Sequence, residues 1–198
     1  MNLVFEQQYW GNHTLVVGVD EVGRGCLAGP VVVGAIVFPI DHVLMRGVND
    51  SKKISRNKRE ILAPIITKQA LAVGFGQVEA EESDRIGIVA AIQQSADTAI
   101  ERLNLSQNYM VASDGPRPIH SPIPGVVLEA IIDGDAKIYS IAAASIAAKV
   151  YRDKLMHQWA EKYSGYGWAT NVGYGTKQHL EAIKNLGLTP LHRRNFCH

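Results

Sequence analysis

Two short apolar segments near the start of the chain predict neighbouring strands. The first, Leu15–Val19, is rich in β-branched residues and runs directly into a glycine-rich turn. The second, Pro30–Phe38, contains the run VVVGAIVF. Short β-branched runs bounded by glycine are typical of buried strands. Because only the glycine-rich segment separates the two, we expect an antiparallel hairpin.

Three further segments, at 71–79, 108–113 and 126–132, also have the apolar composition of strands. Between the first two, apolar residues recur at helical spacing from Ile86 to Leu103. We expect one helix there, with Ser83 as its N-cap.

The later part of the chain is predicted to be mainly helical. Residues Ile138–Trp159 form a long segment rich in alanine, which lets a helix lie close to a sheet. A last helix is expected over Thr176–Asn185, ending at Gly187. Strands therefore come early and helices late, which indicates an α/β fold with a central sheet that begins with an antiparallel hairpin. A length of 198 residues suits one domain over 1–198.

Composition and charge exclude several classes of protein. The chain carries 20 Lys and Arg against 19 Asp and Glu, so a generic charge-driven binder of nucleic acid is not expected. The two cysteines, Cys26 and Cys197, form neither a disulfide framework nor a zinc motif. The start of the chain lacks the pattern of a signal peptide, and the longest apolar stretch, about 27–38, is too short to cross a bilayer. We therefore expect a cytoplasmic protein.

Acidic residues fall at the ends of predicted strands. Asp20 and Glu21 follow the first strand, Asp114 follows the run 109–112, and Asp135 precedes the long helix. Such carboxylates can converge at one edge of a sheet. Each, taken singly, is more often a turn residue or a helix cap, and Asp133 is as acidic as Asp135, so the residues alone leave that choice open.

Several ionised carboxylates at one place require a cation, because like charges raise each other's pKa. Hard oxygen ligands suit Mg²⁺ or Mn²⁺. Successive residues of a strand point to opposite faces, so we expect the first strand to end or distort where Asp20 and Glu21 both reach a metal.

Cationic and aromatic residues gather in two other places. The segment NDSKKISRNKRE at 49–60 contains Lys52 and Lys53, and a second basic cluster contains Arg194. A charge run is usually only a solvated surface, but here it can also contact phosphates. Between the clusters lie aromatic side chains that suit either stacking on bases and sugars or ordinary packing, namely Tyr166, Trp168, Tyr174 and His179.

A series of motifs closely resembles the bacterial ribonuclease HII family. GVDEVGRG at 18–25 is followed in family order by NDSKK at 49–53, DG at 114–115 and GD at 134–135. SIAAASIAAKVYRD at 140–153, GYGT at 173–176 and HRRNF at 192–196 complete the series. The resemblance covers nearly the whole chain. Ribonuclease HI and ribonuclease HIII match less well, because both lack the GRG element.

The resemblance implies a ribonuclease H-like fold, a mixed sheet flanked by helices. It implies an endonuclease that hydrolyses the RNA strand of RNA/DNA hybrids and cuts 5′ of ribonucleotides in duplex DNA, leaving 3′-hydroxyl and 5′-phosphate ends. The implied ligands of two Mg²⁺ or Mn²⁺ ions are Asp20, Glu21, Asp114 and Asp135. Here the acid after the glycine matches, which selects Asp135 over Asp133.

The same resemblance assigns residues that contact substrate. Gly23, Arg24 and Gly25 match the element that senses the ribose 2′-hydroxyl, and Tyr174 matches the tyrosine that packs on the sugar at the RNA–DNA junction. Lys52, Lys53 and Arg194 are candidates for backbone contacts.

The sequence departs from the family pattern at Cys26, Asp133 and Val172. No sliding-clamp-binding tail is visible after Phe196, and we expect a monomer. The alternatives are a different metal-dependent DNA nuclease or a non-catalytic nucleic-acid-binding protein on the same fold.

Overall fold

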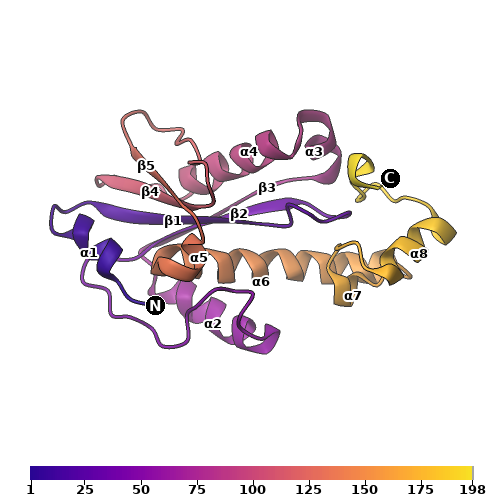
Figure 1. Ribbon diagram of the computed structural model, residues 1–198, viewed down its shortest axis with the longest axis horizontal. Coiled ribbons are helices and arrows are strands. Elements are labelled where there is room, and N and C mark those ends of the chain that lie inside the picture. The colour runs from indigo at the N-terminus through magenta and orange to yellow at the C-terminus, as the bar shows by residue number, and fades with distance from the viewer. Residues whose placement is uncertain (198) are drawn as a thin grey trace.

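The computed structural model describes residues 1–197, which form a five-stranded mixed sheet with helices on both faces (Figure 1). The strand order is β3-β2-β1-β4-β5. β1 pairs antiparallel with β2, β2 antiparallel with β3, and β1, β4 and β5 run parallel. The bounds are β1 Leu15–Val22, β2 Val31–Val37, β3 Ala72–Val78, β4 Tyr109–Asp114 and β5 Val127–Ile131. The predicted hairpin, all five strands and the α/β class are confirmed.

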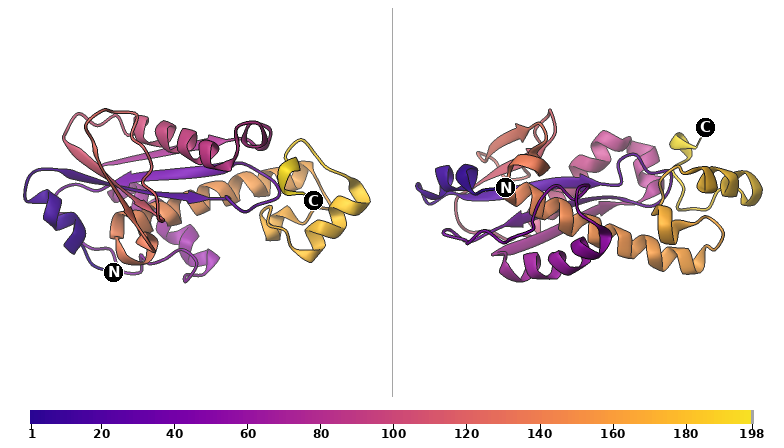
Figure 2. Two further views of the ribbon diagram at one scale, coloured as in Figure 1. Left: turned by 45° about the horizontal axis from the view of Figure 1, so that its top comes forward. Right: turned by 60° about the horizontal axis from the view of Figure 1, so that its bottom comes forward.

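The described helices divide between the two faces of the sheet and its far end. One face carries α3 and α4, and the other carries α6 with α2 outside it (Figures 1 and 2). The bounds are α1 Val4–Trp10, α2 Arg56–Gln69, α3 Ala80–Ile86, α4 Ile88–Glu101, α5 Gly134–Lys137, α6 Tyr139–Lys162, α7 Trp168–Asn171, α8 Lys177–Leu186 and the 3₁₀ turn η1 Arg194–Phe196. None of these helices is long and apolar enough to cross a membrane.

The predicted helix from Ile86 to Leu103 is wrong at its start. Gly87, with a φ of +83°, ends α3 and begins α4, so the segment contains two helices. Ser83 lies inside α3 and does not cap α4. The long helix is confirmed as α6, and the last helix is confirmed as α8, with the Thr176 side chain accepting a hydrogen bond from the His179 amide.

The apolar residues of the central strands alternate between two cores. Leu15, Val17 and Val19 of β1 pack with α4, while Ile36 of β2 packs in the core that contains α6 and α2. The close approach of α6 to β1 depends on Gly18, because a Cβ at this position would lie 2.1 Å from the Ser140 carbonyl carbon. The alanine-rich segment of α6 is therefore held directly against the middle of the sheet.

The C-terminal elements α7, α8 and η1 lie beyond the end of the sheet, beside the distal half of α6 and the turn after β1 (Figure 2). Trp168 of α7 packs with apolar residues of α8 in a separate cluster. A short bridge between Ala28 and His192 joins them to the turn.

Candidate active site

The register of the parallel strands brings Asp20 and Asp114 together. The last β1–β4 pair is Val19 with Ser113, so each aspartate is the next residue on neighbouring strands. Both share the strand face of residues that pack toward α6, such as Gly18 and Ala112. Asp114 is fixed by the amide of Gly134, which donates to its Oδ1 at 2.7 Å. The end of the sheet thus holds two carboxylates in place.

Glu21 lies beside this pair, although β1 does not end or distort there as expected. Regular antiparallel pairing with β2 continues through Glu21 to Val22. Beyond Val19, however, β1 has no β4 partner, and both Asp20 and Glu21 line the same cavity at this open margin. Both acids can therefore reach the cavity because the pairing of β1 with β4 stops before Asp20.

Asp135 is buried at 4% exposure, whereas Asp133 is exposed in a left-handed turn. The Lys52 ammonium donates to Asp135 Oδ2 at 3.1 Å. Asp135 does not cap the long helix, since no side chain caps α6. Asp135, and not Asp133, is therefore linked through Lys52 to the cavity that the other three acids line, although Asp135 is not itself part of that lining.

Burial and mutual repulsion make this acid cluster electrostatically unsatisfied. Burial raises the pKa of Asp20 well above its usual value, and the charges of Glu21, Asp114 and Asp135 raise it further against the Ser145 hydrogen bond. Burial likewise raises the pKa of Glu21 and of Asp135. Carboxylates that are buried and repel one another ionise more readily when a cation is bound beside them than when they are alone.

The donor chemistry of the cluster suits a hard divalent cation, because all four groups offer carboxylate oxygens. Within residues 1–197, no three His, Cys, Asp or Glu side chains are already gathered tightly enough to enclose a metal ion. The exposed Lys52 ammonium neutralises part of the cluster instead. The four acids thus have the donor chemistry of ligands for a divalent cation.

An open cavity of about 220 Å³ extends from the acids across the turn after β1. Its lining includes eight residues expected from the sequence: Asp20, Glu21, Gly23, Arg24, Gly25, Lys52, Asp114 and Tyr174. The Arg24 guanidinium lies 3.5 Å from Glu21 and is largely exposed. The Tyr174 ring is 41% exposed, with the Lys149 ammonium 5.5 Å from its centre.

Some residues expected at the site lie elsewhere. Lys53 pairs with Asp50 at 3.8 Å and is not part of the cavity lining. Arg194 is exposed, and its backbone amide donates to Asp84 beside α3. Of the aromatic residues, Tyr166, Trp168 and His179 are buried, so packing explains them and stacking on substrate does not.

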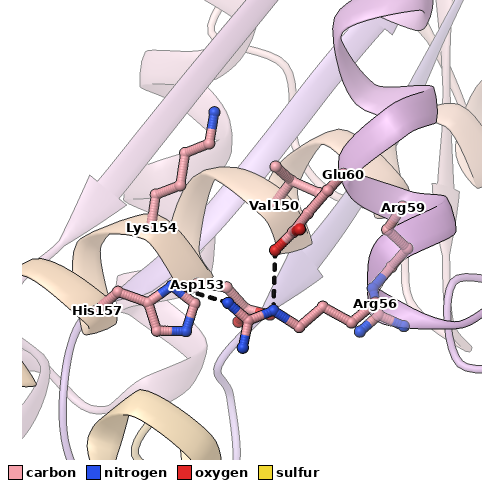
Figure 3. A pocket seen from close by; sticks show the side chains of 7 residues that line it. All are labelled: Arg56, Arg59, Glu60, Val150, Asp153, Lys154 and His157. Atoms are coloured by element: carbon pink, nitrogen blue, oxygen red, sulfur yellow. Dashed lines mark hydrogen bonds and ion pairs between the residues drawn. The ribbon is translucent and has the colours of Figure 1, made fainter.

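The basic segment 49–60 has two structural roles in addition to its charge. Arg59 Nη1 donates to the carbonyls of Ser51 and Ile54 at 2.7 Å each, which fixes the turn that carries Lys52. At the start of α2, Arg56 pairs with Glu60 at 2.8 Å and contacts His157 of α6 beside a small hollow of about 10 Å³ (Figure 3). The hollow is too small for a ligand, so these contacts serve to join α2 to α6.

Four polar side chains that line the cavity were not among the site residues expected from the sequence: Ser51, Arg59, Ser145 and Lys149. Ser51 and Arg59 belong to the segment 49–60 that was expected to contact phosphates, whereas Ser145 and Lys149 were missed. Ser145 and Lys149 are four residues apart on α6, and Ser145 Oγ lies 2.8 Å from Ser51 Oγ. The spacing of four within SIAAASIAAKVYRD was the available signal, because residues four apart share one face of a helix.

The comparisons with known proteins agree along nearly the entire chain. The family model described as ribonuclease HII matches residues 17–198. Ribonuclease HII of Thermosynechococcus vestitus is 44% identical over 197 residues, which cover 99% of this chain and 90% of the relative.

Solved structures show the same arrangement of elements. Ribonuclease HII of Archaeoglobus fulgidus, solved in complex with PCNA, superposes with a TM-score of 0.77 at 28% identity, covering 92% of this chain and 95% of that one. A ribonuclease HIII solved with Mn²⁺ has a TM-score of 0.70 at 18% identity, covering 92% and 67%, and shows the shared fold alone. The chain therefore belongs to the ribonuclease HII family, the endonucleases that hydrolyse the RNA strand of RNA/DNA hybrids.

Proposed function

We propose that Asp20, Glu21, Asp114 and Asp135 hold two divalent cations, Mg²⁺ or Mn²⁺, and that the cavity beside them accepts the strand to be cut. The observation that carries the proposal is a cavity lined by Asp20, Glu21 and Asp114, by the glycine turn and by Tyr174. Asp135 is not in the lining but accepts a hydrogen bond from Lys52, which is. When bound, such ions supply an activated water and stabilise the leaving oxygen in phosphodiester hydrolysis.

The turn after β1 suits selection of a ribonucleotide. The 2′-hydroxyl both donates and accepts hydrogen bonds, so the group that recognises it must offer polar atoms at close range. Gly23 and Gly25 present backbone without side chains to the cavity, and Arg24 is free to turn toward a neighbouring phosphate. We propose that this turn places the scissile bond on the 5′ side of the ribonucleotide, leaving 3′-hydroxyl and 5′-phosphate ends.

Tyr174 lies across the cavity and presents an exposed ring. We propose that it packs on the deoxyribose after the ribonucleotide, where a 2′-hydroxyl would collide with the ring. Lys149 beside the ring and Lys52 beside Asp135 provide cations for phosphates of the bound strand. Lys53 and Arg194 lie outside the cavity, so we propose that they contact only the part of the duplex beyond it.

We propose that the enzyme acts as a monomer. Hydrogen bonds also join the C-terminal elements to the turn after β1, for example from the Arg193 amide to the Leu27 carbonyl at 2.8 Å. This continuity supports one domain over residues 1–198.

The decisive assay compares three duplexes: DNA with one embedded ribonucleotide, a continuous RNA/DNA hybrid, and DNA alone. We expect metal-dependent cleavage of the first two, with the cut 5′ of the single ribonucleotide. Cleavage of the all-DNA duplex at a similar rate would indicate a DNA nuclease. Binding without any cleavage would indicate a non-catalytic protein.

Tyr174→Ala tests the junction role within the same assay. We expect kcat/KM on the single-ribonucleotide duplex to fall about tenfold more than on the continuous hybrid, because only the former requires the RNA–DNA junction. Tyr151→Ala is the matched control, since Tyr151 stacks on Phe75 away from the cavity. Equal losses on both substrates would contradict the role of Tyr174.

A further inference from the structure

Two arginines are completely buried behind the cavity, and the proposed catalytic chemistry uses neither. Arg152 lies in α6 and Arg193 just before η1, and both are 0% exposed. Within residues 1–197, neither guanidinium has a carboxylate within ion-pair distance. A buried charge of this kind requires other hydrogen-bond partners.

The partners of Arg152 are backbone carbonyls of two segments that flank the cavity. The first segment, the ribose loop, is residues 23–30; the second, the tyrosine loop, is residues 172–176. Arg152 donates to Pro30 and Ala28 of the ribose loop at 2.9 Å each, and to Val172 of the tyrosine loop at 2.8 Å. One side chain thus connects the two loops.

Arg193 also holds the ribose loop, through other carbonyls than those bound by Arg152. It donates to the Arg24 carbonyl at 2.9 Å and twice to the Gly29 carbonyl, at 3.1 and 3.0 Å. These two carbonyls lie near opposite ends of the ribose loop, so the Arg193 guanidinium fixes the distance between them.

The two loops also contact each other directly. The amides of Leu27 and Ala28 donate to the Gly173 carbonyl at 2.8 and 3.3 Å, one residue before Tyr174. Gly23 packs onto Arg152, because a Cβ at this position would lie 2.2 Å from Arg152 Nε. The backbone proposed to read the ribose therefore rests on the same guanidinium that holds the tyrosine loop.

We propose that Arg152 and Arg193 are positioning residues that set the ribose loop against the tyrosine loop and thereby determine the preference for a ribonucleotide followed by deoxyribose. This inference rests on the proposed function, since it assigns the two loops to adjacent sugars. The rigid, planar fork of arginine is required, because lysine retains the charge but cannot reach several fixed carbonyls at once.

The test uses the full chain with Arg152→Lys and Arg193→Lys, assayed on the single-ribonucleotide duplex and on the continuous hybrid. We expect kcat/KM on the former to fall about tenfold more than on the latter in both variants. Arg102→Lys is the matched control, because Arg102 is exposed and donates to the Phe75 carbonyl far from the loops. Its ratio should equal that of the unmodified protein.

A second readout follows the loops without catalysis. Hydrogen exchange at the Leu27 amide should accelerate about tenfold in Arg193→Lys relative to Arg102→Lys, because the bond to Gly173 loses its support. Should Arg152→Lys fail to fold, Arg193→Lys alone decides. Equal losses on both substrates, or unchanged exchange at Leu27, would overturn the proposal.

The outcomes separate this proposal from the one on which it rests. If Tyr174→Ala is selective and the arginine variants are not, the positioning role is wrong while the proposed function stands. If Tyr174→Ala is not selective, the junction role fails, and faster exchange at Leu27 would still support the coupling of the loops but not its effect on selection.

Discussion

The acid cluster around Asp20 and the buried arginines 152 and 193 lie in neighbouring parts of the molecule, yet their charges are balanced differently. Three of the acids have a pKa raised by burial, and the cations paired with Glu21 and Asp135 are exposed side chains. The arginines donate six hydrogen bonds to carbonyls of fixed loops. The acid cluster therefore has negative charge that nearby side chains balance only in part, whereas the two arginines have hydrogen-bond partners within the protein.

The difference indicates how the site divides its tasks. Unsatisfied carboxylates bind an ion strongly because its charge relieves their repulsion. Guanidiniums whose hydrogen bonds are all made hold the geometry of the loops, because breaking those hydrogen bonds would leave buried carbonyls without donors. Changes in the acids should therefore affect catalysis more than stability, and changes in the arginines should affect stability and selection.

The largest effect is expected from Asp114→Asn. Loss of one ligand charge should reduce metal-dependent cleavage roughly 1000-fold, equivalent to about 4 kcal/mol of transition-state stabilisation. The fold should persist, because the side-chain oxygen of asparagine can still accept the hydrogen bond from the Gly134 amide. Initial rates in Mg²⁺ and in Mn²⁺ measure the loss, with the exposed Asp41→Asn as control. A fully active variant would remove Asp114 from the ligand set.

Arg152→Met should have the opposite profile, a large loss of stability. Three buried carbonyls would lose their donor, which costs about 3–4 kcal/mol in free energy of unfolding. Urea unfolding of the metal-free protein measures the change against Arg102→Met. A change below about 1 kcal/mol would show that water replaces the guanidinium and that the region is not rigid.

Two neutral histidines also hold the tyrosine loop, and their protonation at low pH should weaken these contacts. His179 Nδ1 lies 2.9 Å from the Tyr174 carbonyl, and His192 contacts His179 at 3.1 Å. Burial lowers the pKa of His192 to about 4 from an ordinary 6.5, so the unfolded chain takes up a proton first as the pH falls. The stability that His192 contributes is complete above pH 6.5 and decreases as the pH falls toward 4, by up to about 3 kcal/mol.

Unfolding free energies measured between pH 4 and 7 test this expectation. His192→Asn should have a shallower dependence on pH than the unmodified protein, whereas the exposed His13→Asn should leave it unchanged. An identical dependence in all three proteins would mean that another group is responsible for it.

Asp20→Asn should change stability in the opposite direction when divalent cations are absent. The pKa of Asp20 is raised in the folded state, so its ionisation disfavours folding as the pH rises above the ordinary value of 3.8. The variant should therefore be more stable than the unmodified protein at pH 7, and the difference should vanish at pH 3. Added Mg²⁺ should stabilise only the unmodified protein. A less stable variant at pH 7 would show that Asp20 is satisfied without an ion.

The strands were predictable because their apolar runs are short and bounded by turns. Helix α2 was not, since its sequence is charged, contains Pro64, and buries only Leu62, Ala63 and Ile66 against the rest of the fold. Packing on α6, which the local pattern does not encode, determines that helix. The break at Gly87 was missed because the apolar spacing continues on both sides of it.

For the site, strand ends located the acids, but only the family resemblance selected Asp135 over Asp133. Neighbouring cations could not be ranked from the sequence. Arg193 and Arg194 are adjacent, and burial of the former depends on how η1 meets the turn after β1. The same holds for Lys52 and Lys53, of which only Lys52 reaches an acid of the cluster.

The close contact between Gly18 and Ser140 has a consequence for laboratory evolution of this enzyme. No larger residue fits at Gly18 unless α6 moves away from β1, and α6 also carries Ser145, Lys149 and Arg152. Variation at this glycine would thus displace two side chains of the cavity, Ser145 and Lys149, together with the buried Arg152 behind it. Saturation libraries that seek a new substrate preference should leave residue 18 and the alanines of α6 fixed, and diversify the cavity rim at 24 and 25.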